Sequence, residues 1–296
     1  MSAVRAYTQH LFCIIFGRMT SYQVVVVIIN HKTELSPFEE ISIQQCVTVL
    51  HKYPIYMIVP SGENFLQIEN KFPSLQLIPI DPHHLANYEN FNRLKIGPFI
   101  YEYFSNYDYL LFYEPDAFVF EDRLEEWCND GYDYIGAPWL EPDAEGQMKL
   151  LEFGNGGFSL RKISSHILVS TTLSKSRRKD VFEWYKEFNV KGKIAKFPAL
   201  ILHLAGMSNQ RISYASRFTI EDIFWSFYVR PQFNWFRIPD PETSLRFSME
   251  LHPKEAFKMN GNRLPMGCHA WWKYDLEFWK PFIESYGYDL TLNNKV

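Results

Sequence analysis

The segment YQVVVVIIN, residues 22–30, leaves few options for the fold of this chain. Its β-branched residues follow one another without a polar position, which is typical of a parallel strand buried on both faces. Three further apolar runs of strand length lie at 54–60, 75–80 and 108–113. Helical patterns separate these runs, and the alternation predicts an α/β fold with a mainly parallel sheet flanked by helices.

The helical patterns are clearest in the first half of the chain. The longest lie at 37–53 and at 90–107, where a Gly-Pro pair interrupts or bends the helix. After residue 120 the elements become shorter and the loops longer. Because no repeat or low-complexity linker divides the chain, we expect a single domain over residues 1–296, with a regular half at about 20–120 and a loop-rich half at about 121–290.

The composition excludes several classes of protein. Hydrophobic residues make up 47% of the chain and charged residues 22%, which is ordinary for a globular protein and excludes a disordered one. The net charge of −4 gives no indication of nucleic-acid binding. Four cysteines without a CxxC pair favour a reducing compartment. We therefore expect a cytoplasmic protein without a nucleic-acid partner.

Two segments bear on contact with membranes. The apolar run at 11–16 has six residues, too few to cross a bilayer, so we expect a surface strand, a tail or a peripheral contact there. Residues 174–196 are rich in Lys and Arg. Such a run is either a solvated face or a patch that meets anionic lipid headgroups, and the second interpretation predicts a peripheral contact with the inner face of a membrane.

Two carboxylates interrupt the apolar run YLLFYEPDAFVFED at Glu114 and Asp116. Carboxylates are costly to bury, and Pro115 between them cannot donate to a sheet ladder. The strand is therefore expected to end near Tyr113, with both acids at its carboxyl end, where open α/β sheets bind ligands. Two nearby carboxylates and an incoming diphosphate would make a good Mg²⁺ or Mn²⁺ site, although acids at strand ends also cap turns.

Three later segments carry further candidate residues. The glycines of GNGGFSLRK, residues 154–162, allow either a close approach of a ligand or a tight turn. Glu221 and Asp222 open an apolar, aromatic helix, where an acid either caps the helix or acts as a general base. His269 lies in the loop GCHAWW beside two tryptophans and is either structural or a ligand.

Taken in order, YEPDAFVF, WCNDGYDYIGAPW, GNGGFSLR, EDIFWS and GCHAWWKYD resemble a bacterial group of glycosyltransferases. That group is similar to the nucleotide-sugar-dependent enzymes of GT-A fold. The resemblance covers roughly residues 22–280. It implies a GT-A-like, Rossmann-like sheet, in which the half at about 20–120 binds the nucleotide sugar and the half at about 121–290 supplies the acceptor site and the catalytic residues.

The resemblance also implies roles for individual residues. Glu114 and Asp116 fall where GT-A enzymes hold Mn²⁺ or Mg²⁺ against the donor diphosphate, and Asp116 is the safer ligand because many relatives have a neutral residue in the first position. His269 falls where many of these enzymes place a third metal ligand. Asp222 corresponds to the base of inverting transferases, and Glu221 would cap the helix or hold an acceptor hydroxyl.

A second set of residues is expected near the donor. The loop after the first strand would meet the base and ribose, the glycine segment would join the donor and acceptor sites, and the helix before the acidic strand would reach the donor. Arg93 on that helix would meet a phosphate or lie on the surface. The donor-site residues implied in this way are Asn30, Lys32, Asn92, Arg93, Asn155, Gly156 and Gly157.

The sequence thus predicts a metal-dependent glycosyltransferase that moves a sugar from a nucleotide-sugar donor to a hydroxyl group of a glycan or a lipid-linked acceptor. The metal would neutralise the departing diphosphate, and a single base would give inversion. Two alternatives remain open: a metal-dependent phosphohydrolase of sugar nucleotides, and a non-catalytic carbohydrate-binding protein.

Overall fold

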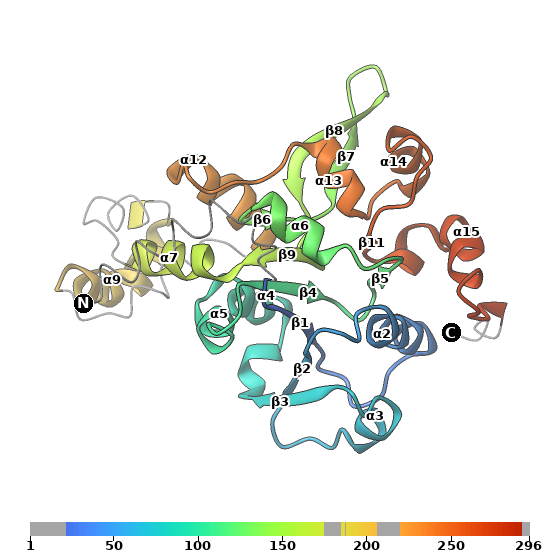
Figure 1. Cartoon of the computed structure of the whole chain (residues 1–296). Coiled ribbons are helices and arrows are strands. Elements are labelled where there is room, and N and C mark those ends of the chain that lie inside the picture. The colour runs from blue at the N-terminus through green and yellow to red at the C-terminus, as the bar shows by residue number, and fades with distance from the viewer. Residues whose placement is uncertain (1–21, 175–184, 187, 206–219, 292–296) are drawn as a thin grey trace, which may run out of the picture.

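The computed structural model of the chain describes residues 22–174, 185–186, 188–205 and 220–291. A central sheet runs through it in the order β3-β2-β1-β4-β9-β6 (Figure 1). Its first four strands are parallel, and β9 and β6 extend it in antiparallel pairing. The strands of this sheet are β1 (Val24–Ile29), β2 (Ile55–Pro60), β3 (Gln76–Ile80), β4 (Tyr109–Tyr113), β6 (Tyr134–Ile135) and β9 (Phe158–Lys162).

Side chains that alternate along β1 enter two different cores. Val24, Val26 and Ile28 join the core under α2, α3 and α6, whereas Val25 and Val27 join the core under α4, α5 and α7. The predicted mainly parallel sheet with helices on both faces is therefore confirmed. These helices are α2 (Pro37–Val49), α3 (Leu66–Lys71), α4 (Tyr88–Ile96), α5 (Phe99–Tyr103), α6 (Leu124–Asp130) and α7 (Ile163–Ser174), with a short 3₁₀ turn η1 (Pro82–Leu85) before α4.

The helical pattern at 90–107 forms two helices rather than one bent helix. Gly97 ends α4 with an extended backbone, φ −69° and ψ 162°, and α5 begins again after Pro98. The restriction that proline places on the preceding residue explains the break.

The second half of the described chain adds two small sheets and several short helices. One small sheet joins β5 (Phe118–Val119), β10 (Ser248–Met249) and β11 (Gly267–Cys268), and the other is the hairpin of β7 (Pro138–Pro142) and β8 (Met148–Gly154). After α7, the described helices of this half are α9 (Val190–Leu204), α11 (Glu221–Ile223), the π-helical η2 (Phe224–Val229), α12 (Arg230–Gln232), α13 (Pro241–Phe247), α14 (Pro253–Met259) and α15 (Trp271–Glu284).

Two predictions from the sequence concern residues that lie partly or wholly outside the described ranges. The apolar run at 11–16 lies outside the described residues, as do residues 175–184 and 187 of the basic segment. Within the described part, no helix is both long enough and apolar enough to span a bilayer.

Candidate active site

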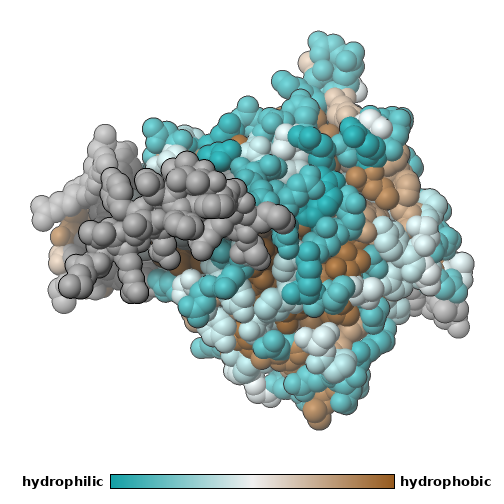
Figure 2. All heavy atoms as spheres, in the orientation of Figure 1, coloured by the Kyte–Doolittle hydropathy of each residue, from teal (hydrophilic) through white to brown (hydrophobic). Residues whose placement is uncertain are grey.

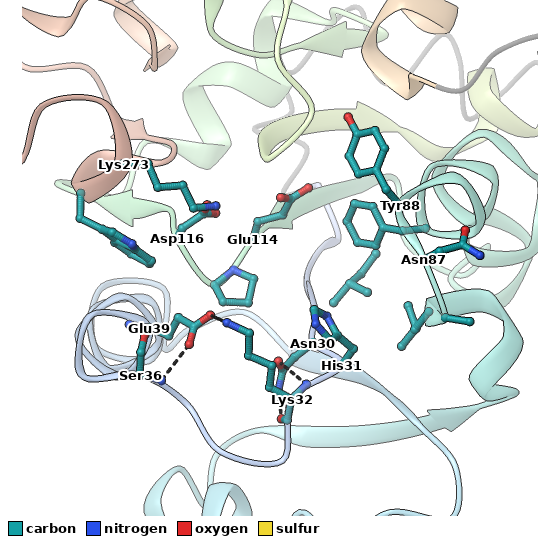
Figure 3. A pocket seen from close by; sticks show the side chains of 16 residues that line it. Asn30, His31, Lys32, Ser36, Glu39, Asn87, Tyr88, Glu114, Asp116 and Lys273 are labelled. Atoms are coloured by element: carbon teal, nitrogen blue, oxygen red, sulfur yellow. Dashed lines mark hydrogen bonds and ion pairs between the residues drawn. The ribbon is translucent and has the colours of Figure 1, made fainter. Parts of the chain in front are cut away.

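A cavity of about 550 Å³ lies at the carboxyl ends of β1 and β4 (Figure 3). This volume is in the range usual for small-molecule sites. Its walls come from four places in the sequence: the loop after β1, the start of α4, the end of β4 and the start of α15. The lining residues include Asn30, Lys32, Tyr88, Phe91, Glu114, Asp116, Trp272 and Lys273.

The loop after β1 is held in place by its own side chains. The Asn30 side chain accepts from the Lys32 backbone N–H at 3.0 Å and donates to the Lys32 carbonyl at 2.7 Å. The Lys32 ammonium contacts Glu39 at 2.7 Å, and Glu39 in turn forms a capping box with Ser36 at the start of α2. This loop is therefore fixed against α2 while its side chains face the cavity.

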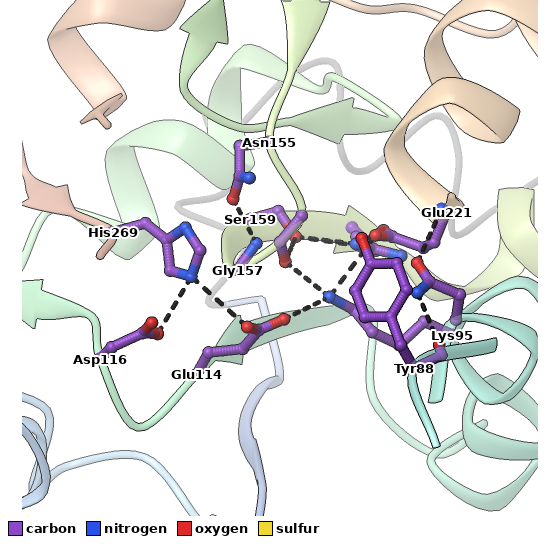
Figure 4. A network of polar contacts seen from close by, with 12 residues as sticks. Tyr88, Lys95, Glu114, Asp116, Asn155, Gly157, Ser159, Glu221 and His269 are labelled. Carbon is purple, nitrogen blue, oxygen red and sulfur yellow. Dashed lines mark hydrogen bonds and ion pairs between the residues drawn. The ribbon is translucent and has the colours of Figure 1, made fainter. Parts of the chain in front are cut away.

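Glu114, Asp116 and His269 form a cluster whose potential ligand atoms all lie within 4.8 Å of one another (Figure 4). His269 Nε2 is 3.0 Å from an Asp116 oxygen and 3.4 Å from a Glu114 oxygen. The fold brings the histidine there through the antiparallel pairing of β11 with β5, in which Cys268 faces Phe118. His269 follows directly after β11 and Asp116 lies two residues before β5, so the small sheet holds the two side chains close together.

These residues fit a divalent cation. One Asp116 oxygen and His269 Nε2 are buried, and neither makes a hydrogen bond, although they face each other. Two carboxylates and an imidazole are a suitable donor set for Mn²⁺ or a similar ion. His269 Nδ1 contacts Glu250 at 2.8 Å, the type of carboxylate contact that orients metal-ligating histidines and fixes their tautomer.

Without a cation, nearby positive groups balance the two acids. Burial would raise the pKa of Glu114, but the Lys95 ammonium and the His269 ring outweigh it and lower the pKa to about 2. Burial would also raise the pKa of Asp116, yet His269 and Lys273 hold it below its usual value. For His269, burial would lower the pKa, but Asp116 and the other facing carboxylates hold it well above its usual value. A bound divalent ion would replace the proton on Nε2.

The two acids at the start of α11, Glu221 and Asp222, have different surroundings. Glu221 pairs with Arg161, which is fully buried, and lies 3.5 Å from the Lys95 ammonium. Lys95 also donates to Glu114 at 2.8 Å and to the Gly156 carbonyl at 3.1 Å, so it connects the strand-end cluster with α11 (Figure 4).

Asp222 has a different environment from its neighbour. It makes no ion pair with another described residue, and its carboxylate accepts only the N–H of Ile223, at 3.1 Å. Burial, and then the charge of Glu221, raise the pKa of Asp222 to about 7. The helix continues from Asp222 into the π-helical η2, a geometry that is often found at functional sites. Neither acid makes a side-chain cap of the helix.

The glycine segment packs between the two acidic regions. A Cβ built on Gly156 would overlap the Glu221 carboxylate, and one built on Gly157 would overlap the His269 ring. Asn155 accepts from the Gly157 N–H at 2.6 Å and donates to Glu250 at 2.9 Å. The backbone here approaches both regions so closely that only glycine fits.

The other predicted donor residues lie in different places. Asn30 and Lys32 line the cavity, whereas Asn92 and Arg93 are not among its lining residues. Asn92 accepts from the Glu221 backbone N–H at 2.9 Å, and Arg93 pairs with Glu89 on the same helix. Lys95, Arg161, Glu250 and Lys273 carry no signal in the sequence that predicts a role in the site, although Lys273 follows directly after the tryptophans of the GCHAWWK segment.

Several solved structures show a limited likeness to this chain. The mannosyltransferase Ktr4p from S. cerevisiae in complex with GDP aligns over 41% of this chain at 14% identity with a TM-score of 0.32, and this chain covers only 41% of its length. A glycosyltransferase involved in the glycosylation of the major capsid of PBCV-1 aligns over 88% of this chain and 98% of its own, at 10% identity and a TM-score of 0.41. Mouse xyloside xylosyltransferase 1 in its apo form aligns over 84% and 97%, at 11% identity and a TM-score of 0.43.

Comparison by sequence finds one family and no curated relative. No curated protein matches the chain. A family model described as "Protein of unknown function (DUF5672)" matches residues 74–269, which is more than half of the chain. The chain therefore belongs to the DUF5672 family.

Proposed function

We propose that this protein is a metal-dependent glycosyltransferase, which moves a sugar from a nucleotide-sugar donor to a hydroxyl group of a glycan or a lipid-linked acceptor. The observation that carries the proposal is the convergence of Glu114, Asp116 and His269 at the edge of the cavity between β1 and α15. The sequence resemblance to GT-A enzymes agrees with this reading of the geometry.

In this proposal the donor diphosphate occupies the cavity beside the acidic cluster. A divalent ion, Mn²⁺ or Mg²⁺, would be held by Asp116 and His269 with Glu114 in contact or close by, and would supply positive charge against the diphosphate. The Lys273 side chain lines the same cavity and is 58% exposed, so its ammonium can donate to a phosphate oxygen once a ligand replaces its contact with Asp116.

The acceptor step needs a base, and we assign that role to Asp222. As the acceptor oxygen attacks the anomeric carbon, its proton passes to the Asp222 carboxylate. The bond from the anomeric carbon to the phosphate oxygen breaks, and its electron pair leaves with the diphosphate. A pKa of about 7 suits a base that must take a proton near neutral pH. A single displacement of this kind inverts the anomeric configuration.

We assign Glu221 a positioning role. Its carboxylate is engaged by Arg161 and Lys95, and its backbone N–H by Asn92, so it fixes the start of α11. The Glu221 carboxylate lies against Gly156, so the start of α11, which carries Asp222, is held beside the glycine segment. In the same proposal, the half at about 20–120 binds the donor and the half at about 121–290 binds the acceptor.

We place the protein in the cytoplasm. Cys46, Cys128 and Cys268 are all buried and free of disulfides, which is the usual state of cysteines in a reducing compartment.

A thermal-shift screen of nucleotide sugars, with and without Mn²⁺, tests the proposal first, because a bound ligand raises the melting temperature. We expect one donor to stabilise the protein only when Mn²⁺ is present, and acceptor-dependent release of the nucleoside diphosphate to follow. Release of sugar 1-phosphate and nucleoside monophosphate without an acceptor would instead identify a phosphohydrolase. Donor binding without turnover under any acceptor would identify a binding protein, and full activity in EDTA would exclude the metal.

A further inference from the structure

The helix α9 carries an exposed apolar stripe. Val190, Ile194, Phe197 and Ile201 follow one another at intervals of four, three and four residues, which places them on one face of a helix. Their exposed fractions are 74%, 72%, 51% and 51%, whereas Leu200 on another face is buried. The helix thus packs against the protein with one side and presents large apolar side chains to solvent with the other.

Positive charges flank this stripe on both sides. With about 100° between successive residues, Lys191 lies on one side of the stripe and Lys193 on the other, with Lys196 beyond it. No Asp or Glu occurs anywhere in Val190–Leu204. A helix with apolar residues along one line and lysines at its borders is the pattern of segments that lie in the interfacial plane of a bilayer.

We infer that α9 docks this protein onto an anionic lipid surface. The stripe would enter the boundary between headgroups and acyl chains, and the lysine ammonium groups would contact lipid phosphates. A protein partner fits less well, because lysine is depleted in protein–protein interfaces and this border carries only one sign of charge. The inference does not depend on the proposed catalytic activity.

The position of α9 permits such contact. Figure 1 places it at the margin of the molecule, away from the β7–β8 hairpin, and Figure 2 shows apolar atoms at the same margin. The helix has 15 residues, and at about 1.5 Å per residue it is long enough to lie flat on a surface with all four stripe residues in contact. No described residue of α9 lines the cavity, which is built mainly around β1, β4 and α4. Contact of α9 with a lipid surface would therefore not require the cavity residues.

Flotation of the full chain with lipid vesicles tests the inference. We expect binding to vesicles of phosphatidylcholine with one part in three phosphatidylglycerol, and little binding to pure phosphatidylcholine. Ile194→Asp should weaken binding at least about tenfold, because it places a charge in the stripe. Lys191→Gln, at the exposed border of the stripe, should weaken it about fivefold, the usual effect of one lysine near an anionic surface. High salt should weaken the wild type and have a smaller effect on the lysine variant.

Leu66→Asp is the matched control, since Leu66 is also an exposed apolar residue, at 58%, but lies on α3. It should bind vesicles like the wild type, and all variants should keep the wild-type melting temperature because the sites are exposed. The inference fails if the wild type does not bind anionic vesicles, or if Ile194→Asp binds as well as Leu66→Asp. It also fails if sedimentation shows a dimer that Ile194→Asp dissociates, because the stripe would then cover a second copy of the chain.

Discussion

The protein holds two pairs of carboxylates with similar spacing in sequence and opposite surroundings. Glu114 and Asp116, at the end of β4, face Lys95, Lys273 and His269, and the pKa values of both are lowered. In the pair that opens α11, Glu221 contacts the side chains of Arg161 and Lys95, whereas Asp222 makes no ion pair with a described residue. The pKa of Asp222 is raised to about 7.

The difference shows that the charged neighbours of a carboxyl group set its pKa, and with it the chemistry for which the group is suited. Carboxylates that stay ionised over the whole physiological range are suited to hold a cation. A carboxylate that exchanges a proton near neutral pH is suited to act as a base.

Asp222→Asn is expected to cause the largest loss. The amide retains the shape of the side chain and can still accept from Ile223, but it cannot take a proton, so kcat should fall by about 10²–10⁴-fold. Donor affinity in the presence of Mn²⁺ should be unchanged, since the strand-end pair is intact. Steady-state kinetics and calorimetric titration separate the two quantities.

The control for this variant is Asp143→Asn, an exposed acid in the turn between β7 and β8, which should leave kcat as it is. If Asp222→Asn turns over at a near-normal rate, Asp222 has no part in the mechanism and the contrast between the two pairs is only structural.

Lys95→Met is expected to destabilise the fold by about 3–5 kcal/mol, because it leaves Glu114 and Glu221 buried without their shared cation. Urea unfolding measures this loss. The matched variant Lys32→Met also breaks an ion pair, with Glu39, but the Lys32 side chain is 47% exposed, so the loss should be about 1 kcal/mol or less.

A second substitution tests the cause. Adding Glu114→Gln to Lys95→Met should restore part of the stability, because one of the two carboxylates that have lost the Lys95 ammonium is then uncharged. If the double variant is no more stable than Lys95→Met, the lysine acts through packing and not through its charge.

Glu250→Gln is expected to reduce Mn²⁺ affinity by about 10–100-fold, the usual effect of losing the carboxylate that orients a ligating histidine. Titration of the free protein with Mn²⁺ measures this without requiring activity. Glu255→Gln on α14 is the control and should bind Mn²⁺ like the wild type. Equal affinity in both variants would remove Glu250 from the metal site.

The first half of the fold could be predicted because its strands are continuous apolar runs. Every position of β1 is buried, and a run that is apolar on both faces has few alternatives to a central parallel strand. The second half could not be predicted in the same way. The strands β5, β10 and β11 have two residues each, which is too few to show a period, and the pairing of β5 with β11 joins residues more than a hundred positions apart.

The candidate site was predictable where polar residues interrupt an apolar pattern. Glu114 and Asp116 stand out at the end of β4, and His269 stands out within an aromatic loop. Lys95 and Arg161 gave no such signal, because a cation in an amphipathic helix or at the end of a strand is ordinarily solvated. Only the three-dimensional structure shows that both cations are buried. It also shows that Arg161 pairs with Glu221, whereas Lys95 lies between Glu221 and Glu114.

The effect with the smallest change per step is a dependence of stability on pH, which has opposite signs at the two pairs. The pKa of Asp222 is about 7 in the folded protein and has the ordinary value of 3.8 when unfolded, so the folded state binds more protons between these values. Asp222 therefore reduces stability as pH rises from about 4 to 7, by at most about 1.4 kcal/mol per pH unit. In EDTA, Asp222→Asn should match the wild type near pH 4 and be more stable above pH 7.

Asp116→Asn should behave in the reverse way. Its pKa is lowered in the folded protein, so the ionised side chain stabilises the fold at every pH above its unfolded value, and that contribution is lost only as the pH falls below it. The variant should therefore be less stable than the wild type at neutral pH and approach it in acid. Urea midpoints at a series of pH values measure both differences. A constant difference between wild type and Asp222→Asn from pH 4 to 8 would show that Asp222 ionises as easily in the fold as outside it, and the two pairs would then not differ in the property that assigns their roles.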